Sequence, residues 1–438
     1  MRRDYLGFVT ELQRQHGDIT FMRIINEKAY DLLSPELVRE ALVDNAQHLI
    51  RWERGIEVFE QLFGRSVLVT EGAIWQRQRR MLMPAFSPKR VAGYATLMRE
   101  AAAVALDAAL PEGAIHGEVS MDALFSQLAM DVILRTLFGH DATAGETQQA
   151  IAATQTLSEA AFSAMFRPFT LPDWLPLPGK AAKRQALHSL RTLIGSHIAQ
   201  RQVQPTPDGE ELLSRLLALR DEETGEALTE TEIFDQCMIS FQAGHETSAT
   251  ALLWWSRLLA EHPVVAERIQ AELGQVLGHR EPTPEDLPAL LWLTASLKEA
   301  MRLYPPVAAI MSRRTTQAMT LGGWQIPRGA MLRVTPWVLQ RDPRWFPQPE
   351  AFKPEHFLPD REPPPRGAWM PFGAGPRVCI GQHFAMLEMT LVGAMLLQRY
   401  RLEMPADAAP CEPELHVTLR PRGGVRLQLV RLSPALNP

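Results

Sequence analysis

The sequence has few cysteines and no long apolar run. Cys237, Cys379 and Cys411 are the only cysteines among 438 residues. They are odd in number and form no CxxC pair, so neither a disulfide framework nor a cysteine-based zinc site is indicated. Residues 1–18 hold nothing near the roughly 20 apolar residues that a membrane span needs. We therefore expect a cytoplasmic protein with no membrane anchor.

Basic tracts and flexible linkers are also missing. The net charge is -5 and the isoelectric point is about 6.2, with no continuous basic segment, so a nucleic-acid partner is not expected. A length prior of roughly 100–200 residues per domain suggests two or three domains. However, no Gly/Ser-rich linker, charge block or internal repeat divides the chain, so one large domain remains an alternative.

Helical periodicity dominates what is present. Apolar residues recur at three- and four-residue spacing through four stretches, Val91–Leu110, Leu124–Leu137, Ala182–Gln200 and Ile233–Leu259. Strand-like segments are short and lie near the chain ends, at Ile19–Ile24, Met319–Pro336 and His416–Val430. The sequence therefore predicts a mainly α fold with small sheets beside it.

The longest predicted helix begins at Thr229, where Glu232 completes a capping box, and stops before Pro263. Its middle is apolar on most sides, so we expect it to be buried. A polar cluster interrupts this apolar helix, and buried polar groups need partners. The cluster consists of Gly244, Glu246, Thr247 and Ser248.

Three interpretations of this cluster compete. A zinc protease HExxH site is excluded because Ala249 stands where the second histidine would be. A structural role has the Thr247 hydroxyl donate to the carbonyl of Ala243, four residues earlier. In a functional role, Gly244 leaves room for a ligand, while Thr247 and Glu246 offer a hydroxyl and an acid for proton relay.

A second unusual segment, FGAGPRVCIG from Phe372 to Gly381, places a cysteine among three glycines and a proline just before an apolar helix-like run. A helix N-terminus exposes amide donors and a partial positive charge, which favour a thiolate at Cys379. Gly381 would let a flat cofactor approach the helix closely. Taken alone, the cysteine also fits a free, half-buried thiol.

The spacing F-x-x-G-x-R-x-C-x-G, formed by Phe372, Gly375, Arg377, Cys379 and Gly381, resembles the haem-ligand loop of the cytochrome P450 family. Further segments are similar to that family in the expected order: the Trp helix at Gly72–Pro88, the oxygen-binding helix at Ala243–Ser248, the E-x-x-R helix at Lys298–Pro306 and the meander at Phe352–Phe357. The resemblance runs from about His16 to the last strand.

The resemblance implies one domain spanning residues 1–438, mainly α with a small β-rich lobe. The β-rich pieces would lie near residues 17–35, 310–336 and 412–431, and the helical body at 36–305 and 380–400. Haem b would bind between the long central helix and the cysteine-loop helix. This implied fold overrides the length prior.

The resemblance also assigns cofactor residues. Cys379 would be the axial ligand of the haem iron, because a thiolate donates electron density that favours O–O cleavage. The anionic propionates would be bound by Trp75, Arg79, Arg313 and Arg377. Arg314 adjoins Arg313, so a slip of one residue in register would exchange the two. Phe372, Gly381, Ala243 and Gly244 would also contact the haem.

A structural pair is expected below the haem. Glu299 and Arg302 are spaced i, i+3 on one helix face and are close enough to pair. In the family this pair joins the helix to the meander, usually with an arginine as third partner. This chain has His356 there, which should hold Glu299 less firmly than a bidentate arginine.

The implied activity is that of a bacterial haem-thiolate monooxygenase. It would insert one oxygen atom of O2 into a C–H bond, with Thr247 stabilising bound oxygen and Glu246 feeding protons. No flavin or iron–sulfur motif occurs in the chain. Electrons would thus come from NAD(P)H through a separate ferredoxin- or flavodoxin-type partner, with the enzyme a monomer. Arg77, Arg80, Lys89 and Arg90 are either a docking patch or a solvated surface.

An apolar substrate is expected, most simply a fatty acid or similar long-chain lipid, since the LYPP and WQRQRR segments resemble fatty-acid-oxidising members. A terpene, steroid or xenobiotic is the alternative. Candidate pocket residues, which equally suit core packing, are Ile239, Gln242, Ala243, Phe162, Phe166, Val307, Ile310 and Leu419. Two other classes stay open: a haem-thiolate isomerase or dehydratase, whose known members commonly lack the acid–alcohol pair, and a haem sensor, which would need a signalling segment.

Overall fold

A computed structural model describes residues 4–24, 26–139, 143–167, 175, 177–204, 211–309 and 311–432. Its helices are α1 (Tyr5–His16), α2 (Pro35–Arg39), α3 (Glu53–Phe63), α4 (Gly72–Leu82), α5 (Pro88–Ala92), α6 (Ala95–Asp107), α7 (Met121–Phe138), α8 (Ala144–Met165), α9 (Lys180–Val203), α10 (Leu212–Ala218), α11 (Glu230–Glu261), α12 (Pro263–Val276), α13 (Leu291–Leu303), α14 (Pro336–Leu339) and α15 (Gln382–Arg399). Its strands are β1 (Ile19–Ile24), β2 (Glu27–Leu32), β3 (Leu49–Arg51), β4 (His116–Ser120), β5 (Met311–Thr315), β6 (Met319–Leu321), β7 (Trp324–Ile326), β8 (Met331–Val334), β9 (Tyr400–Glu403), β10 (Pro413–Leu415), β11 (Leu419–Pro421) and β12 (Arg426–Arg431).

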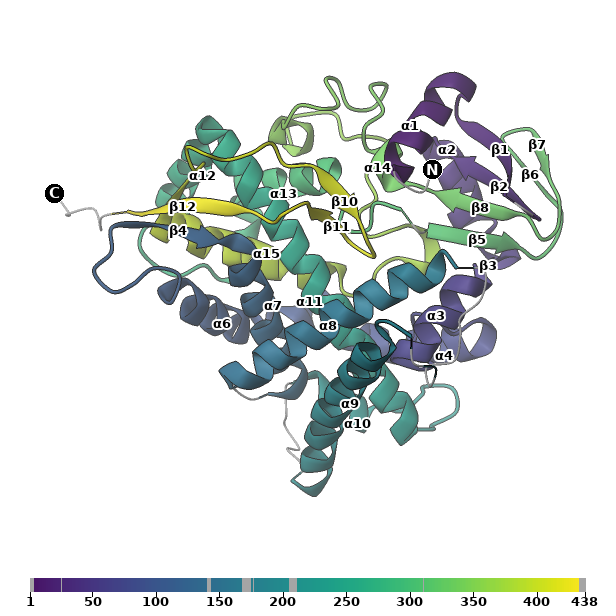
Figure 1. Ribbon diagram of the computed structural model, residues 1–438, viewed down its shortest axis with the longest axis horizontal. Coiled ribbons are helices and arrows are strands. Elements are labelled where there is room, and N and C mark those ends of the chain that lie inside the picture. Colours follow the sequence, from purple (N-terminus) through teal and green to yellow (C-terminus); the bar gives the residue numbers. More distant parts are fainter. Residues whose placement is uncertain are drawn as a thin grey trace.

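The central helix α11 runs through the helical body (Figure 1). As predicted, it starts after Thr229 with a capping box to Glu232 and ends just before Pro263. Its 32 residues span about 48 Å. Because it is apolar on most sides, it packs against α7, α13 and α15 at once.

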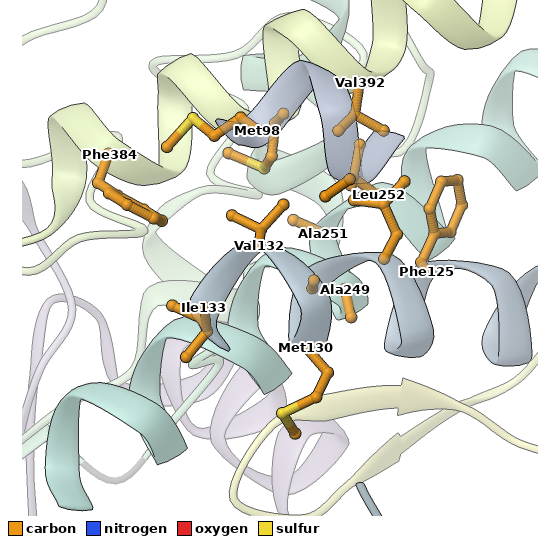
Figure 2. Close-up of a cluster of buried hydrophobic side chains, with 14 of the residues drawn as sticks. Met98, Phe125, Met130, Val132, Ile133, Ala249, Ala251, Leu252, Phe384 and Val392 are labelled. Carbon is orange, nitrogen blue, oxygen red and sulfur yellow. The ribbon is translucent and has the colours of Figure 1, made fainter. Parts of the chain in front are cut away.

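The main core lies where α6, α7, α11 and α15 meet. Figure 2 shows Met98, Phe125, Val132, Leu252 and Val392 pointing toward one another from these four helices. Each of the five side chains is buried. Their packing fixes α11 against α7 on one side and α15 on the other, and therefore fixes the helices that carry both unusual motifs.

The predicted helical stretches are confirmed with one difference. Leu124–Leu137 lies within α7 and Ala182–Gln200 within α9. The stretch Val91–Leu110 forms two helices, because the Gly93 amide bonds the Arg90 carbonyl in a tight turn between α5 and α6. Among the described residues, no helix combines the length and hydropathy required to cross a bilayer.

A five-stranded sheet in the order β1-β2-β8-β5-β3 lies at the right of Figure 1, beside the helices. Strand β2 pairs parallel with β8, and the other neighbours pair antiparallel. A Gly-Gly turn joins β6 to β7, where Gly322 and Gly323 have φ values of 53° and 83°. Such positive φ values suit glycine.

Two strands fall inside the range 36–305 that was expected to be helical. Strand β3 pairs with β5, and β4 pairs with β12. That expectation was wrong for these segments because each strand is short and its partner is far away in sequence, so local periodicity carries little signal. The mainly α fold with small sheets is otherwise as predicted.

Candidate functional site

A cavity of about 360 Å³ lies between α11 and the cysteine loop that precedes α15. We call it the haem cavity. Helix α4 and strand β5 contribute further wall residues. It gathers Thr247 and most of the predicted cofactor residues, namely Cys379, Arg79, Arg313, Arg377, Phe372, Gly381, Ala243 and Gly244. Residues far apart in sequence therefore line one space.

The cysteine loop holds its shape through backbone contacts. The Cys379 amide donates to the Phe372 carbonyl at 2.8 Å. Gly375 has φ 70°, and a Cβ there would lie 1.9 Å from the carbonyl oxygen of Leu42. Both conditions require glycine at this position. Gly375 therefore allows the cysteine loop to pack closely against the backbone at Leu42.

The Cys379 thiol is open to the cavity although it lies deep in the protein. Burial raises its pKa, and the amide of Gly381 and the charge of Arg79 offset this only in part. The amide at the helix start therefore favours a thiolate at Cys379, as the sequence predicts, but burial outweighs it and the pKa stays above its usual value. A bound metal cation would supply the missing stabilisation.

Four guanidinium groups gather at the cavity wall. Arg79 donates to the Val378 carbonyl at 2.9 Å, and Arg377 bonds the Thr70 carbonyl and pairs with Glu71. Burial, together with the neighbouring arginines, lowers the pKa of Arg377 to about 10. Burial also lowers the pKa of Arg313 and, with repulsion from its neighbours, that of Arg51.

This cluster carries more positive charge than Glu71 neutralises, so it fits a ligand with two carboxylates, such as haem with its propionates. The facing Cys379 and the apolar walls fit the iron and the porphyrin plane. No motif marks Arg51, which ends the short strand β3. Arg51 pairs with Arg313 in the register of β3 and β5, and this pairing between distant segments places it in the cluster.

The structure distinguishes Arg313 from its neighbour Arg314 as a wall residue of the haem cavity. Arg313 lines the cavity, whereas Arg314 pairs with Glu27 and Glu53. Neighbouring residues of a strand point to opposite faces, so the register is fixed.

Trp75 lies outside the cavity lining formed by the described residues. The guanidinium carbon of Arg377 lies 4.1 Å from the centroid of the Trp75 ring, so the ring stabilises that cation.

Helix α11 presents Thr247 to the haem cavity. The Thr247 hydroxyl donates to the Ala243 carbonyl at 2.7 Å, so the structural interpretation of this residue is correct. The same oxygen still faces the cavity, and the functional interpretation is compatible with it. The side chain of Ile133 packs into the space beside Gly244, and its Cδ1 atom would lie 2.3 Å from a Cβ added at Gly244. This glycine therefore brings α7 close to α11.

Glu246 lies on a different face of α11 from Thr247. Its carboxylate accepts hydrogen bonds from Arg420 at 2.8 Å, Ser158 at 2.7 Å, Thr418 at 2.5 Å and Gln242 at 3.1 Å. Burial raises the pKa of this carboxyl, but Arg420 and the hydroxyl donors outweigh burial and hold the pKa below its usual value. Glu246 is therefore an ionised, firmly held carboxylate.

The structural pair forms as predicted. Arg302 donates to Glu299 at 2.7 and 2.8 Å, and both side chains are 0% exposed. The Nδ1 atom of His356 lies 3.2 Å from both carboxylate oxygens, and the Lys353 amide donates at 2.8 Å. His356 thus occupies the third position and leaves Glu299 fully hydrogen-bonded.

Only some of the residues predicted for the substrate pocket line the haem cavity. Ile239, Ala243 and Val307 line the cavity. Gln242 bonds Glu246, Phe162 packs on Phe166 and His416, and Leu419 packs with Ala308, so these residues lie elsewhere. Ile310 falls outside the described residues. Further apolar wall residues are Val67, Leu68, Phe86, Ile133, Leu137 and Leu212.

The suggested docking patch is partly neutralised. Arg77 pairs with Glu232 at 2.7 Å, and Arg80 pairs with Asp221 at 2.9 Å. These two arginines already have acidic partners within the chain. Lys89 and Arg90 are exposed, which fits a docking patch and a solvated surface equally well.

Comparison with known proteins agrees with this arrangement. The cytochrome P450 family matches residues 2–428. Cyclooctatin synthase of Streptomyces melanosporofaciens is 34% identical over 96% of this chain and 91% of its own length. Cyclooctat-9-en-7-ol 5-monooxygenase of the same organism is 34% identical over 88% and 83%. Pentalenene oxygenase of Streptomyces avermitilis is 32% identical over 99% and 94%.

Two of these relatives are named as a monooxygenase and an oxygenase, and none of the three is named as an isomerase, a dehydratase or a sensor. None of the three names mentions a fatty acid. The extent of the family match, together with a cysteine loop that faces Thr247 across a cavity suited to haem, leads to one conclusion. The chain belongs to the cytochrome P450 family and is a haem-dependent monooxygenase.

Proposed function

We propose that the enzyme hydroxylates a compact cyclic hydrocarbon or alcohol of the terpene type. The observation that carries this substrate class is the relatives' names, which contain cyclooctatin, cyclooctat-9-en-7-ol and pentalenene. The mostly apolar cavity wall formed by Ile133, Leu137, Ile239 and Val307 supports it, because such a wall selects by shape and apolar contact. Electrons come from NAD(P)H through a separate ferredoxin- or flavodoxin-type protein.

Each side chain has a separate task in this proposal. Cys379 holds haem, which when bound supplies the activation of dioxygen that side chains alone cannot provide. Arg51, Arg79, Arg313 and Arg377 hold the propionates. The apolar wall positions the substrate and excludes water. Thr247 holds a proton at Oγ1 for delivery into the cavity, and Glu246 replenishes protons from the other face of α11.

A ligand panel tests the substrate class. Cyclic terpenes, steroids and straight-chain fatty acids are titrated into the ferric protein, and the low- to high-spin absorption change is recorded. We expect micromolar terpenes to give the change and to yield a product that carries one atom of ¹⁸O from ¹⁸O2. A response to fatty acids without a response to terpenes would reject the proposed class.

The role of Thr247 is tested by a matched pair of variants. Thr247→Ala removes the hydroxyl, so we expect haem binding to persist while most of the electrons consumed appear as hydrogen peroxide. Thr247→Ser keeps a hydroxyl and should retain most of the product yield. Equal yields of product from both variants would show that the hydroxyl is not needed.

A further inference from the structure

Residues 64–71, between α3 and α4, form one side of the haem cavity. We call this segment the wall loop. Its middle residues Val67 and Leu68 line the cavity, whereas Ser66 is fully buried. Every residue of the loop is described, and none lies in a helix or strand. Contacts made by other segments therefore decide where the two wall residues stand.

The arginine cluster holds the end of the wall loop. The Thr70 carbonyl accepts a hydrogen bond from Arg377 at 2.9 Å. Glu71 pairs with Arg377 and also accepts the Arg51 amide at 3.1 Å. These arginines line the haem cavity, so a change at this end of the loop would also disturb the cofactor site.

Helix α11 holds the start of the wall loop. Asp235 accepts the Arg65 amide at 2.7 Å. The side-chain oxygen of Gln236 accepts the Val67 amide at 3.1 Å. Gly64 allows this close approach, because its φ is 67° and an added Cβ would lie 1.9 Å from an Asp235 oxygen. The backbone on either side of Ser66 is thus bonded to α11.

Gln236 is an expensive residue to bury. Its side chain is 1% exposed, and its amide nitrogen has no hydrogen-bond partner among the residues that the structure describes. An apolar side chain of similar size would avoid the cost of this unpaired donor. What an apolar side chain would lose is the oxygen that accepts the Val67 amide. The bond to the wall loop therefore accounts for a glutamine at this position.

The same stretch of α11 carries the opposite part of this argument, the wall that the helix itself contributes. Ile239 and Ser240 line the haem cavity and follow Gln236 by three and four residues. Residues at these spacings share a helix face. The bonds from Asp235 and Gln236 therefore fix the wall made by the loop relative to the wall made by α11.

We propose that Gln236, assisted by Asp235, is a positioning residue that sets which ligand shapes the haem cavity accepts, because it fixes Val67 and Leu68. Neither Gln236 nor Asp235 is among the described residues that line the cavity, so both act through the wall loop. The inference rests on the proposed function in one respect, which is that the substrate is held by shape and apolar contact.

Two substitutions at Gln236 separate its oxygen from its size. Gln236→Met keeps the length of the side chain but removes the acceptor, whereas Gln236→Glu keeps an oxygen that accepts in either protonation state. Gln78 still bonds the Arg65 carbonyl at 3.0 Å, so the loop should shift at Val67 rather than unfold. Gln200→Met, at an exposed position of α9 outside the haem cavity, is the matched control. If Gln236→Met does not load haem, Asp235→Ala breaks the neighbouring bond instead.

The first readout measures the cavity with two probes that bind haem iron through an imidazole nitrogen. Imidazole is small, whereas 4-phenylimidazole carries a ring that needs contact with the apolar wall. In absorption titrations we expect Gln236→Met to raise the Kd of 4-phenylimidazole at least threefold relative to that of imidazole. Gln236→Glu should restore at least half of this change, and Gln200→Met should match the wild type. An unchanged ratio in Gln236→Met would overturn the proposal.

The second readout needs neither haem nor activity. Amide hydrogen exchange of peptides covering residues 64–71 should be at least threefold faster in Gln236→Met than in the wild type or Gln200→Met, because the Val67 amide has lost its acceptor. Equal exchange would show that the bond does not hold the loop and would overturn the proposal. If both readouts come out as expected but no terpene changes the spin state of the wild type, the proposed substrate class is rejected and the role of Gln236 stands.

Discussion

Replacing Glu299 by Gln should destabilise the protein strongly, because it leaves a buried cation without its counter-ion. Glu299 and Arg302 are both 0% exposed and share two hydrogen bonds of 2.7 and 2.8 Å. Arg302 would keep its bonds to the carbonyls of Gln340, Pro349 and Ala351, which carry no full charge. Removing one partner of such a pair costs about 3–5 kcal/mol of unfolding free energy.

Urea unfolding followed by circular dichroism measures this cost, and Glu11→Gln is the matched control. Glu11 and Arg14 have the same i, i+3 spacing on α1, but their side chains are 47% and 72% exposed. We expect the unfolding midpoint of Glu11→Gln to equal that of the wild type. A Glu299→Gln midpoint indistinguishable from that of Glu11→Gln would refute the argument that this pair joins α13 to the meander.

The same pair makes a prediction about pH. Burial raises the pKa of Glu299, but hydrogen bonds from Arg302 and His356 outweigh burial, so the folded-state pKa lies below its usual value. The unfolded chain then binds more protons near that pKa, and the stabilisation is present above about pH 4 and lost below it. The difference between wild type and Glu299→Gln should therefore shrink on acidification. A difference that grows toward acid would contradict this assignment.

Further predictions concern single residues. Burial raises the pKa of Glu388 to about 8, so the folded state holds an extra proton and stability should fall by up to about 1.4 kcal/mol per pH unit between pH 5 and 8. In urea unfolding Glu388→Gln should remove that slope, and an unchanged slope would contradict it. Arg313→Gln should weaken haem binding about 10- to 150-fold through a lost charge-assisted bond, while Arg314→Gln should not; haem-to-protein absorbance after gel filtration compares the two, and equal loss would reject the assignment. Gly375→Ala should lower the thermal midpoint because its φ is 70° and Leu42 occupies the space, and an unchanged midpoint would refute this.

The sequence predicted the parts of the site that have fixed local spacing. Cys379 with Arg377, Glu299 with Arg302, and the capped helix start at Thr229 all depend on contacts or geometry within a few residues. Short-range geometry is encoded by residue type and spacing, so these features could be found without coordinates. The structure then brings Cys379 and Thr247 to one cavity.

Long-range packing explains what the sequence could not supply. Arg51 joins the arginine cluster because β3 pairs with β5, some 260 residues later in the chain. Glu246 is paired with Arg420 on a C-terminal strand, so its orientation away from Thr247 depends on a contact between distant segments. Leu419 packs into a separate cluster for the same reason. Periodicity along the chain contains no information on such pairings.

The carbon monoxide spectrum of the reduced, haem-loaded protein tests the central claim most directly. Cys379 is the proposed axial ligand, and a thiolate ligand gives a red-shifted Soret band that histidine or water ligation does not. We predict this band for the wild type and its loss in Cys379→Ser, while Cys411→Ser, which alters a half-buried cysteine outside the haem cavity, keeps it. A wild-type protein that binds haem without the thiolate band, or a Cys379→Ser variant that retains the band, would contradict the account.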